Sequence, residues 1–526
     1  MENTLLDQVK VPADFGFDSS KFPTFRELQL ETAQGVANSQ KPLSLVEAPT
    51  GSGKSLLALT AHRLMKEPRA VYLVSTKQLQ DQIESDFHIP VLKGRSNYPC
   101  LHFPRLFPDV TSEICKEYLG DDDCEYANDC PYLRQKRKAL MSSICVLNYP
   151  LFLTEANYVG KFSGLKYMIL DEIDTLEDHL MNFIGVTITP RLLKRFGLGL
   201  PHYKTRPESW KEWVEVVKLR IEAEVRRMEP KETLPPIKLK DYIRLKRLCG
   251  RLAYLTDTLD ENWVMEHEEN KALSPVIFKP VKISSFAKSN LWDHTEKSLG
   301  MSATIMGAQP MALDLGLHTW DVESTSLPSP FPIESRRVQY SPIANITHRT
   351  KDLEYPKLGN AVGIILDKHP KEKVLIHAVS YDLRNFLVDY LRPAYHLVMT
   401  HDRNDRAIAL EKFKSYNQPV AFISPSMERG IDLPGDLCRV IIVAKVPYPN
   451  LASPQVNKRL YGFSDGSLWY ARKTARALVQ MTGRATRSQG DWSLSFILDE
   501  QFGHLVSRNK SIFPAWWKES ISSGQL

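Results

Sequence analysis

The sequence has no uninterrupted apolar run long enough to cross a lipid bilayer, and its first residues lack a basic stretch followed by a hydrophobic one. It also lacks a strong net charge, because 68 Lys and Arg residues face 62 Asp and Glu residues in a chain of 526. The first absence argues against a helical membrane protein and against a secreted one. The second means that overall charge does not by itself establish a nucleic-acid partner. We therefore expect an intracellular, cytoplasmic protein that does not bind a membrane.

Cysteines are few, seven in all, and in an intracellular chain they do not indicate a disulfide framework. Four of them fall in one window with the spacing C-x14-C-x8-C-x5-C. Four thiols so close together can surround one metal centre, which a small irregular segment needs for stability. Structural zinc sites usually carry closer C-x2-4-C pairs, so the spacing favours an iron–sulfur cluster, with zinc and unligated thiols as the alternatives. The four residues are Cys100, Cys115, Cys124 and Cys130.

Residues 46–55, VEAPTGSGKS, form a glycine-rich loop that ends in Lys-Ser after an apolar run. We expect a short buried strand at 43–46, then the loop, then a helix over 55–65. In such a loop the glycines let backbone N–H groups turn toward a phosphate, the lysine reaches the β- and γ-phosphates, and the serine hydroxyl binds Mg²⁺. The sequence thus predicts a nucleoside triphosphate site. Its predicted contacts are Ala48, Thr50, Gly51, Ser52, Gly53, Lys54 and Ser55.

A second buried strand, at 165–170, ends in two adjacent carboxylates, Asp171 and Glu172. In P-loop ATPases an Asp at such a strand end holds Mg²⁺, and the next Glu can polarise the attacking water. An acidic turn after a strand is common, so the pair gains its meaning from the phosphate loop. Gln29, in an amphipathic helix upstream of that loop, is a weaker candidate for reading the adenine edge with its amide.

A linker at residues 327–332, LPSPFP, precedes a second α/β unit. The last predicted element, 471–487, is a basic helix that ends in QMTGRATR. Two arginines three residues apart, Arg484 and Arg487, can point at a γ-phosphate and stabilise the charge on the transferred phosphoryl oxygens. The predicted strands of this unit are residues 373–380, 420–424 and 440–444.

Residues 175–281 interrupt the alternation of strands and helices and are expected to be largely helical. Within them, residues 191–250 hold 16 Lys and Arg against 8 Asp and Glu, an excess larger than that of the whole chain. A solvated helical face and a surface that contacts phosphates both explain this excess. We interpret the segment as an insertion, because residues 302–304, Ser-Ala-Thr, return the chain to the first core.

Together these motifs resemble those of superfamily 2 helicases, in the correct order over most of the chain. The cysteine-rich and helical insertions make the chain similar to the XPD/DinG branch of iron–sulfur DNA helicases. The motifs that carry the resemblance are residues 25–29, 48–55, 171–172, 302–304, 430–432 and 480–487.

The resemblance implies an α/β fold with two RecA-like P-loop motor domains, and with a [4Fe-4S] insert and a mostly helical Arch-like insert in the first. It implies an ATP-dependent DNA helicase, a monomeric motor that moves 5′ to 3′ along single-stranded DNA and opens forked duplex DNA and DNA–RNA hybrids. ATP, Mg²⁺ and the cluster are the implied cofactors. The implied boundaries are 1–92, 141–176 and 285–326 for the first motor domain, 93–140 for the cluster insert, 177–284 for the Arch-like insert and 327–526 for the second motor domain.

The resemblance also assigns roles to single residues. In the first motor domain, Gln29 would read adenine, Lys54 and Ser55 would contact the phosphates and Mg²⁺, Asp171 would bind the metal, and Glu172 would activate water. The four clustered cysteines would hold the iron–sulfur cluster. In the second motor domain, Arg484 and Arg487 would be arginine fingers, Gln480 would link the nucleotide to cleft closure, and Gly430 and Asp432 would lie on the nucleotide side. The residues expected toward the DNA path are Thr76, Gln78, Asn148 and Ser380.

Two positions depart from the family pattern. Asp174 stands where the family commonly has His in its Asp-Glu-x-His box, and Arg429 stands where a Glu commonly precedes the Gly at 430. ATP hydrolysis depends on neither residue in the scheme above. The departures leave open how the nucleotide state reaches the DNA site.

Other functions share part of this pattern. A translocase that strips proteins or RNA from DNA with little unwinding would carry every motif. A P-loop metabolite kinase does not explain the second α/β unit, and a zinc-stapled binding module does not explain the intact Lys54, Asp171 and Glu172. ATP hydrolysis stimulated by single-stranded DNA separates these classes, because a kinase would ignore the polymer.

Overall fold

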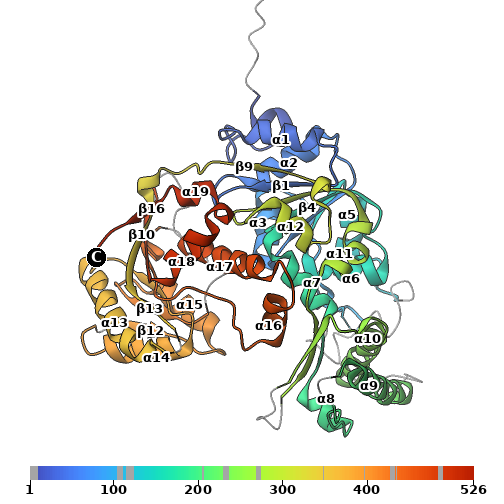
Figure 1. Ribbon diagram of the computed structural model, residues 1–526. Coiled ribbons are helices and arrows are strands. Elements are labelled where there is room, and N and C mark those ends of the chain that lie inside the picture. The colour runs from blue at the N-terminus through green and yellow to red at the C-terminus, as the bar shows by residue number, and fades with distance from the viewer. Residues whose placement is uncertain are drawn as a thin grey trace, which may run out of the picture.

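The computed structural model describes residues 10–102, 111–113, 124–203, 206–228, 236–267, 274–347, 349–395, 397–426, 433, 435–483 and 490–525. Within these ranges the chain forms two parallel β-sheets and a smaller antiparallel one (Figure 1). None of the helices described there is both long and apolar enough to cross a membrane.

The first sheet has six parallel strands in the order β3-β2-β4-β8-β1-β9. All five residues of β2 are buried, the pattern of a parallel sheet covered by helices on both faces. Strand β8 follows the insertion in sequence but lies between β4 and β1, so the insertion leaves and re-enters one domain, which we call the first α/β domain. Its strands are β1 Leu43–Glu47, β2 Ala70–Val74, β3 Ile144–Asn148, β4 Leu165–Asp171, β8 Thr295–Ser302 and β9 Val322–Ser326. Its helices are α1 Gln29–Asn38, α2 Lys54–Leu64, α3 Lys77–Phe87, α5 Pro131–Met141, α6 Tyr149–Thr154, α7 Leu176–Ile184, α11 Ser284–Asn290 and α12 Ala308–Asp314.

In its described residues the insertion combines three helices with a three-stranded antiparallel sheet in the order β5-β7-β6, and we call this unit the insert. The sequence indicates its helices but misses its sheet. Strand β5 has only three residues, and its partner β7 lies almost ninety positions further along, so neighbouring residues carry little sign of the pairing. The strands are β5 Val186–Ile188, β6 Trp263–Glu266 and β7 Val276–Pro280, and the helices are α8 Pro190–Arg195, α9 Pro207–Met228 and α10 Pro236–Thr258.

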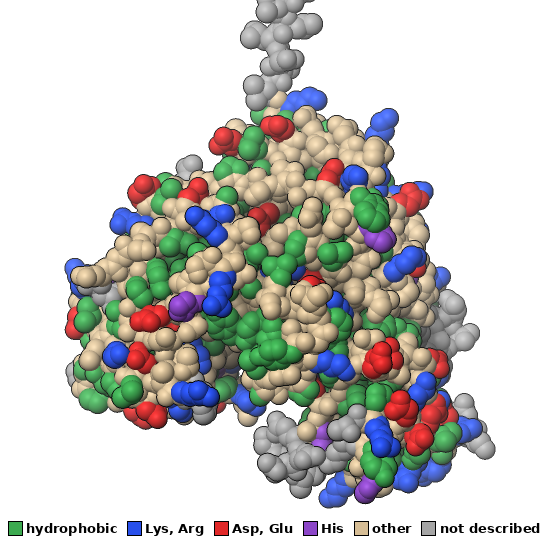
Figure 2. Space-filling view, in the orientation of Figure 1, with side chains coloured by type: hydrophobic (Ala, Val, Ile, Leu, Met, Phe, Trp, Pro, Cys, Tyr) green, Lys and Arg blue, Asp and Glu red, His purple; other side chains and the backbone are tan. Residues whose placement is uncertain are grey.

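Ion pairs on the insert surface neutralise part of its basic excess. Arg195 lies 2.8 Å from Glu224 and also pairs with Asp241, while Arg227 lies 2.8 Å from Glu224. Figure 2 shows Lys and Arg side chains mixed with Asp and Glu at the lower right, where the insert lies. A solvated, internally paired face therefore accounts for part of the excess.

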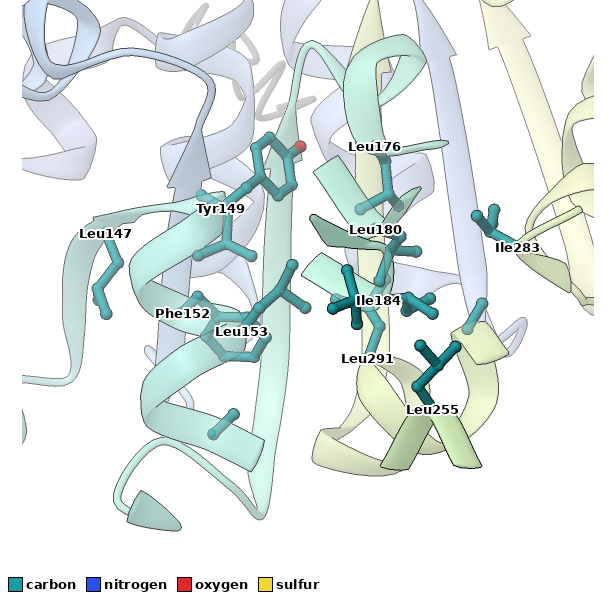
Figure 3. Close-up of a cluster of buried hydrophobic side chains, with 14 of the residues drawn as sticks. Leu147, Tyr149, Phe152, Leu153, Leu176, Leu180, Ile184, Leu255, Ile283 and Leu291 are labelled. Carbon is teal, nitrogen blue, oxygen red and sulfur yellow. The ribbon is translucent and has the colours of Figure 1, made fainter. Parts of the chain in front are cut away.

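One hydrophobic cluster joins the first α/β domain to the insert (Figure 3). Phe152 of α6 and Leu180 and Ile184 of α7 belong to the same cluster as Leu255 of α10, and all four are buried. Burial of a side chain of this size stabilises a fold by roughly 1.5–3 kcal/mol. The insert is therefore anchored to the first domain by a shared core.

The second sheet has seven parallel strands in the order β12-β13-β11-β14-β15-β10-β16 and forms the second α/β domain. The predicted strands at 373–380, 420–424 and 440–444 correspond to β11, β13 and β14. The predicted basic helix is α17, which begins at Gly466 and ends at Thr482, earlier than expected. The strands are β10 Arg336–Ala344, β11 Val374–His377, β12 Val398–Thr400, β13 Ala421–Ser424, β14 Val440–Val443, β15 Ser493–Asp499 and β16 Ile521–Ser523. The helices are α13 Lys351–Lys368, α14 Tyr381–Leu391, α15 Arg406–Ser415, α16 Pro454–Tyr461, α17 Gly466–Thr482, α18 Gln501–Asn509 and α19 Ala515–Lys518.

The buried carboxyl of Asp499, at the end of β15, predicts a pH dependence of stability. It accepts hydrogen bonds from the backbone N–H groups of Val446 at 2.8 Å and Gln501 at 3.0 Å, but burial raises its pKa to about 6. Between about pH 4 and pH 6 the native state therefore holds a proton that the unfolded state has released. The proton's contribution to the free energy of unfolding is complete below the unfolded pKa and is lost as pH rises through about 6. The loss amounts to at most ~3 kcal/mol.

The free energy of unfolding of Asp499→Asn, relative to that of the wild type, is therefore expected to be higher at pH 7 than at pH 4.5. Urea unfolding at the two pH values measures this difference, since the cost of the altered backbone contacts is similar at both. Asp436→Asn is the control, because the side chain of Asp436 is 96% exposed. Equal effects of Asp499→Asn at both pH values would contradict the prediction.

Candidate functional site

The phosphate loop lies between β1 and α2, as the sequence predicts, and two glycines give it its shape. Gly51 and Gly53 have φ values of 80° and 77°, in the left-handed region that favours glycine. A Cβ at Gly53 would lie 2.4 Å from Gln29 Nε2, so the close approach of α1 to the loop also requires glycine there. Lys54 Nζ lies 3.4 Å from the carbonyl oxygens of both Ala48 and Pro49. The loop is folded, with its lysine at the first position of α2.

Gln29 supports this loop directly. Its side chain is buried, and Nε2 donates to the Gly53 carbonyl at 2.8 Å while Oε1 accepts from the Arg26 N–H at 3.0 Å. The amide is thus hydrogen-bonded to protein on both sides, and it joins α1 to the phosphate loop. That it reads adenine stays a prediction.

The two predicted carboxylates lie at the end of β4, beside the loop. Burial raises the pKa of Asp171, against the opposing effect of the Lys54 charge. Burial and then the neighbouring Asp171 raise the pKa of Glu172, which adopts a left-handed φ of 52° and accepts a hydrogen bond from the Ser75 hydroxyl. A partly buried carboxyl with a raised pKa beside a phosphate loop is suited to accept a proton during catalysis.

Tyr72, on β2, connects the two residues that the sequence assigns to Mg²⁺. Its hydroxyl donates to Asp171 Oδ2 at 3.2 Å and lies 3.3 Å from Ser55 Oγ. Both oxygens therefore border the same phenol, and a hydroxyl and a carboxylate are oxygen donors of the kind that Mg²⁺ takes, so the chemistry of the donor set fits Mg²⁺. Burial, followed by the Asp171 charge, raises the pKa of Tyr72 well above its usual value, and the phenol keeps its proton. The sequence gives no sign of this role, because a tyrosine in a buried strand is an ordinary core residue.

Tyr72→Phe is expected to raise the Mg²⁺ concentration needed for tight nucleotide binding by about 10-fold, in line with the loss of other groups that orient metal ligands. Binding of a fluorescent ADP analogue at increasing Mg²⁺ measures this without hydrolysis. Tyr167→Phe is the matched control, because Tyr167 is a buried tyrosine on β4 whose hydroxyl has no hydrogen-bond partner among the described residues. The same Mg²⁺ dependence in both variants would contradict the prediction.

Asp174 lies at the meeting point of the two α/β domains. It is buried, and its carboxylate accepts from Ser302 Oγ at 2.7 Å, Thr304 Oγ1 at 3.1 Å and Gln480 Nε2 at 2.9 Å. Arg476 Nε lies 3.7 Å from the same carboxylate. The residue that departs from the family pattern thus joins the Asp-Glu turn, the Ser-Ala-Thr turn and the second domain in one network.

Four residues of α17 form a contact surface on the first domain, which we call the α17 face: Arg472, Lys473, Arg476 and Gln480. Arg472 Nε donates to the Met306 carbonyl at 2.9 Å, and its guanidinium pairs with Asp314. Lys473 lies 2.9 Å from Glu177, and Arg476 Nη1 donates to the Asp174 carbonyl at 3.1 Å. Of these four residues, the sequence motifs indicate only Gln480. The four-residue spacing of 472, 476 and 480 on one helical side is the signal that could have found the others.

The arginine and glycine motifs of the second domain, Arg484, Arg487, Gly430 and Asp432, lie outside the described residues, as does Arg429. Their assigned roles stay predictions.

Three of the residues expected toward the DNA path are helix N-caps at the ends of parallel strands. Thr76 accepts from the Leu79 N–H at 3.2 Å, Asn148 from the Leu151 N–H at 3.0 Å and Ser380 from the Leu383 N–H at 3.3 Å. Gln78 is exposed on α3. Capping accounts for the first three structurally, and a contact of any of the four with DNA stays a prediction.

Three of the four clustered cysteines are described, and Cys115 lies outside the described residues. Cys100, Cys124 and Cys130 are buried, and Ser112 connects two of their segments, because its Oγ donates to the Pro99 carbonyl at 3.1 Å and lies 3.9 Å from Cys130 Sγ. Among the described residues, no three His, Cys, Asp or Glu side chains converge as a metal centre requires. The described part of the chain therefore does not show the predicted cluster site.

Both α/β domains are similar in sequence to known protein families. Residues 26–189 match the family described as DEAD/DEAH box helicase, and residues 364–520 match the family described as helicase C-terminal domain. The chain is 22% identical to a probable ATP-dependent helicase of Methanocaldococcus jannaschii over 94% of each chain. It is 21% identical to the ATP-dependent DNA helicase YoaA of Haemophilus influenzae over 93% of this chain and 92% of that protein. Its fold is similar to a solved structure of an XPD helicase, with a TM-score of 0.65, 14% identity, and coverage of 95% of this chain and 99% of that one.

Proposed function

The chain carries a DEAD/DEAH box helicase domain and a helicase C-terminal domain and is distantly homologous to the YoaA helicases, and on this premise we propose that it is an ATP-dependent DNA helicase. It hydrolyses ATP between its two α/β domains, moves 5′ to 3′ along single-stranded DNA, and separates duplex DNA or DNA–RNA hybrids. The two α/β domains are its motor domains.

The residues of the first domain supply most of the chemistry of hydrolysis. Backbone N–H groups of the phosphate loop bind the phosphates, and the positive charge of Lys54 lies beside the β- and γ-phosphates. Ser55 and Asp171 hold Mg²⁺, which neutralises charge on those phosphates when it is bound. Glu172 accepts the proton of the attacking water. Arg484 and Arg487 of the second domain stabilise the transferred phosphoryl group.

The observation that carries the proposal is the network around Asp174. It brings Gln480 of the second domain within 2.9 Å of a carboxylate only two positions after Glu172. Closure of the two domains around ATP therefore acts directly on the turn that carries the catalytic base. This is the connection that a motor needs between hydrolysis and domain movement.

Stimulation of ATP hydrolysis by single-stranded DNA tests the proposal. We expect many-fold stimulation, and strand separation of a forked duplex that carries a 5′ single-stranded tail. ATP hydrolysis that ignores DNA would contradict the proposal and favour a metabolite kinase. Stimulation without strand separation would identify a translocase.

We further propose that Cys100, Cys115, Cys124 and Cys130 hold a [4Fe-4S] cluster. The number and spacing of the four cysteines carry this assignment, because among the described residues no three metal-ligating side chains converge, and Cys115 lies outside them. Anaerobically purified protein is expected to absorb broadly near ~400 nm and to contain about four irons and four sulfides per chain. A colourless protein with one zinc would contradict the cluster and leave the ATPase assignment intact.

A further inference from the structure

Helix α16 of the second α/β domain lies against the base of the insert (Figure 1). Gln455 Nε2 donates to the Val281 carbonyl at 2.9 Å, and both residues are buried. Lys458 Nζ donates to the Glu261 carbonyl and lies 3.5 Å from the Trp263 carbonyl. These contacts meet at one end of the antiparallel sheet, because Trp263, which begins β6, pairs with Pro280, the residue before Val281.

A second set of contacts lies between α16 and α17. Lys282, the residue after Val281, lies 3.0 Å from Asp465, which immediately precedes α17, and its ammonium lies 4.4 Å from the centre of the Phe463 ring. Asp465 also accepts two hydrogen bonds from Arg459, at 2.8 and 2.9 Å. Contacts with these two charged partners hold the pKa of Asp465 down to about 2, so the carboxylate stays charged at neutral pH.

Helices α16 and α17 pack closely against each other and form one unit. A Cβ at Gly466 would lie 2.1 Å from the Leu460 carbonyl oxygen and 2.6 Å from that of Arg459, so only glycine allows the two helices to approach this closely. The buried Arg459 then connects this unit to Asp314 of the first domain at 3.2 Å.

The two ends of α17 therefore contact different parts of the molecule. Gln480, near its C-terminal end, contacts Asp174 beside the catalytic turn, and Asp465, just before its N-terminal end, contacts Lys282 of the insert. The helix has 17 residues and spans about 25 Å. A rotation of the second domain that changes the contact at Gln480 also displaces α16, which contacts the insert.

From this geometry we infer that α16, with Lys282 and Lys458 as positioning residues, transmits the movement of the second α/β domain to the insert and so converts ATP hydrolysis into duplex opening. The inference rests on the proposed helicase function. The shared hydrophobic cluster holds the insert on the first domain, and the polar contacts with α16 bind it to the second. Such polar contacts rearrange more readily than a packed core, so they are the part of the junction that follows domain movement.

The double variant K282M/K458M tests the inference, because Met keeps most of each apolar stem and removes the charge and the donors. We expect duplex unwinding per ATP to fall at least about 5-fold while ATP hydrolysis stimulated by single-stranded DNA stays within about twofold of wild type. K351M/K357M is the matched control, since Lys351 and Lys357 pair with Asp382 and Glu354 inside the second domain and the change in charge is the same. K282R/K458R keeps the charge and donors and is expected to restore coupling.

A distance measurement separates this inference from the proposed function. Dyes at positions 219 on α9 and 40 in the first domain, both exposed, report movement of the insert when a non-hydrolysable ATP analogue and single-stranded DNA bind. We expect a change of energy transfer in the wild type and in K351M/K357M, and a smaller change in K282M/K458M.

An equal change in all three, or none in the wild type, overturns the inference even if the protein unwinds DNA. An equal loss of hydrolysis and unwinding in K282M/K458M also overturns it, because it indicates a merely structural role. A wild type that hydrolyses ATP without opening a duplex contradicts the proposed function instead.

Discussion

Glu172→Gln is expected to lower the rate of ATP hydrolysis by about 10²- to 10⁴-fold, the range lost when a positioned general base is removed. The amide keeps the size of the side chain and can still contact the Ser75 hydroxyl, but it cannot accept a proton from water. Nucleotide binding should persist, because the phosphate loop and Asp171 are unchanged. Phosphate release under saturating ATP measures the rate, and a fluorescent ATP analogue measures the binding.

Glu31→Gln is the matched control for this experiment. Glu31 is exposed on α1 of the same domain, and its neutralisation changes the net charge equally. Hydrolysis by Glu172→Gln within tenfold of the control would exclude Glu172 as the principal base. Loss of nucleotide binding along with hydrolysis would indicate damage to the loop instead of the loss of a proton acceptor.

Asp174→Asn is expected to weaken both the fold and the response to DNA. The change leaves the buried Arg476 facing a neutral group and gives Ser302, Thr304 and Gln480 one carboxamide oxygen in place of two carboxylate oxygens. Breaking a buried ion pair by removing one partner costs about 3–5 kcal/mol. We expect a lower free energy of unfolding and a loss of most of the stimulation of ATP hydrolysis by single-stranded DNA, because the contact of Gln480 with the turn that carries Glu172 is weakened.

Asp178→Asn is the control for Asp174→Asn. Asp178 also pairs with α17, lying 3.0 Å from Lys473, but its side chain is 58% exposed. Solvent-exposed pairs contribute about 0–1 kcal/mol, so this variant should unfold and respond to DNA much like the wild type. Chemical unfolding and DNA-dependent hydrolysis compare the two. Equal behaviour of the two variants would show that burial of the Asp174 network contributes nothing to the motor.

The contacts of Asp174 could not be predicted from the family pattern. The sequence identifies it as a departure from the expected His and leaves open how the nucleotide state is relayed. In the structure, its neighbours come from turns at 302–304 and from α17, more than a hundred positions away. The carboxylate matches the hydroxyl, amide and guanidinium donors that face it, so the departure fits its surroundings.

The sequence alone determined the parts of this protein that depend on a few adjacent residues. The glycines and Lys54 of the phosphate loop, the carboxylates at the end of β4 and several apolar strands, among them β11, β13 and β14, are set by local backbone preference and by hydrophobic pattern, so they could be read directly. Only the tertiary structure decided which distant side chains complete them. Tyr72 reaches Asp171 because β2 and β4 pair side by side, the small sheet of the insert forms between strands far apart in the chain, and α16 meets that sheet because Gly466 allows it to pack tightly on α17. These contacts depend on how separate elements dock, and docking is set by the shapes and charges of whole surfaces, which no short stretch of sequence contains.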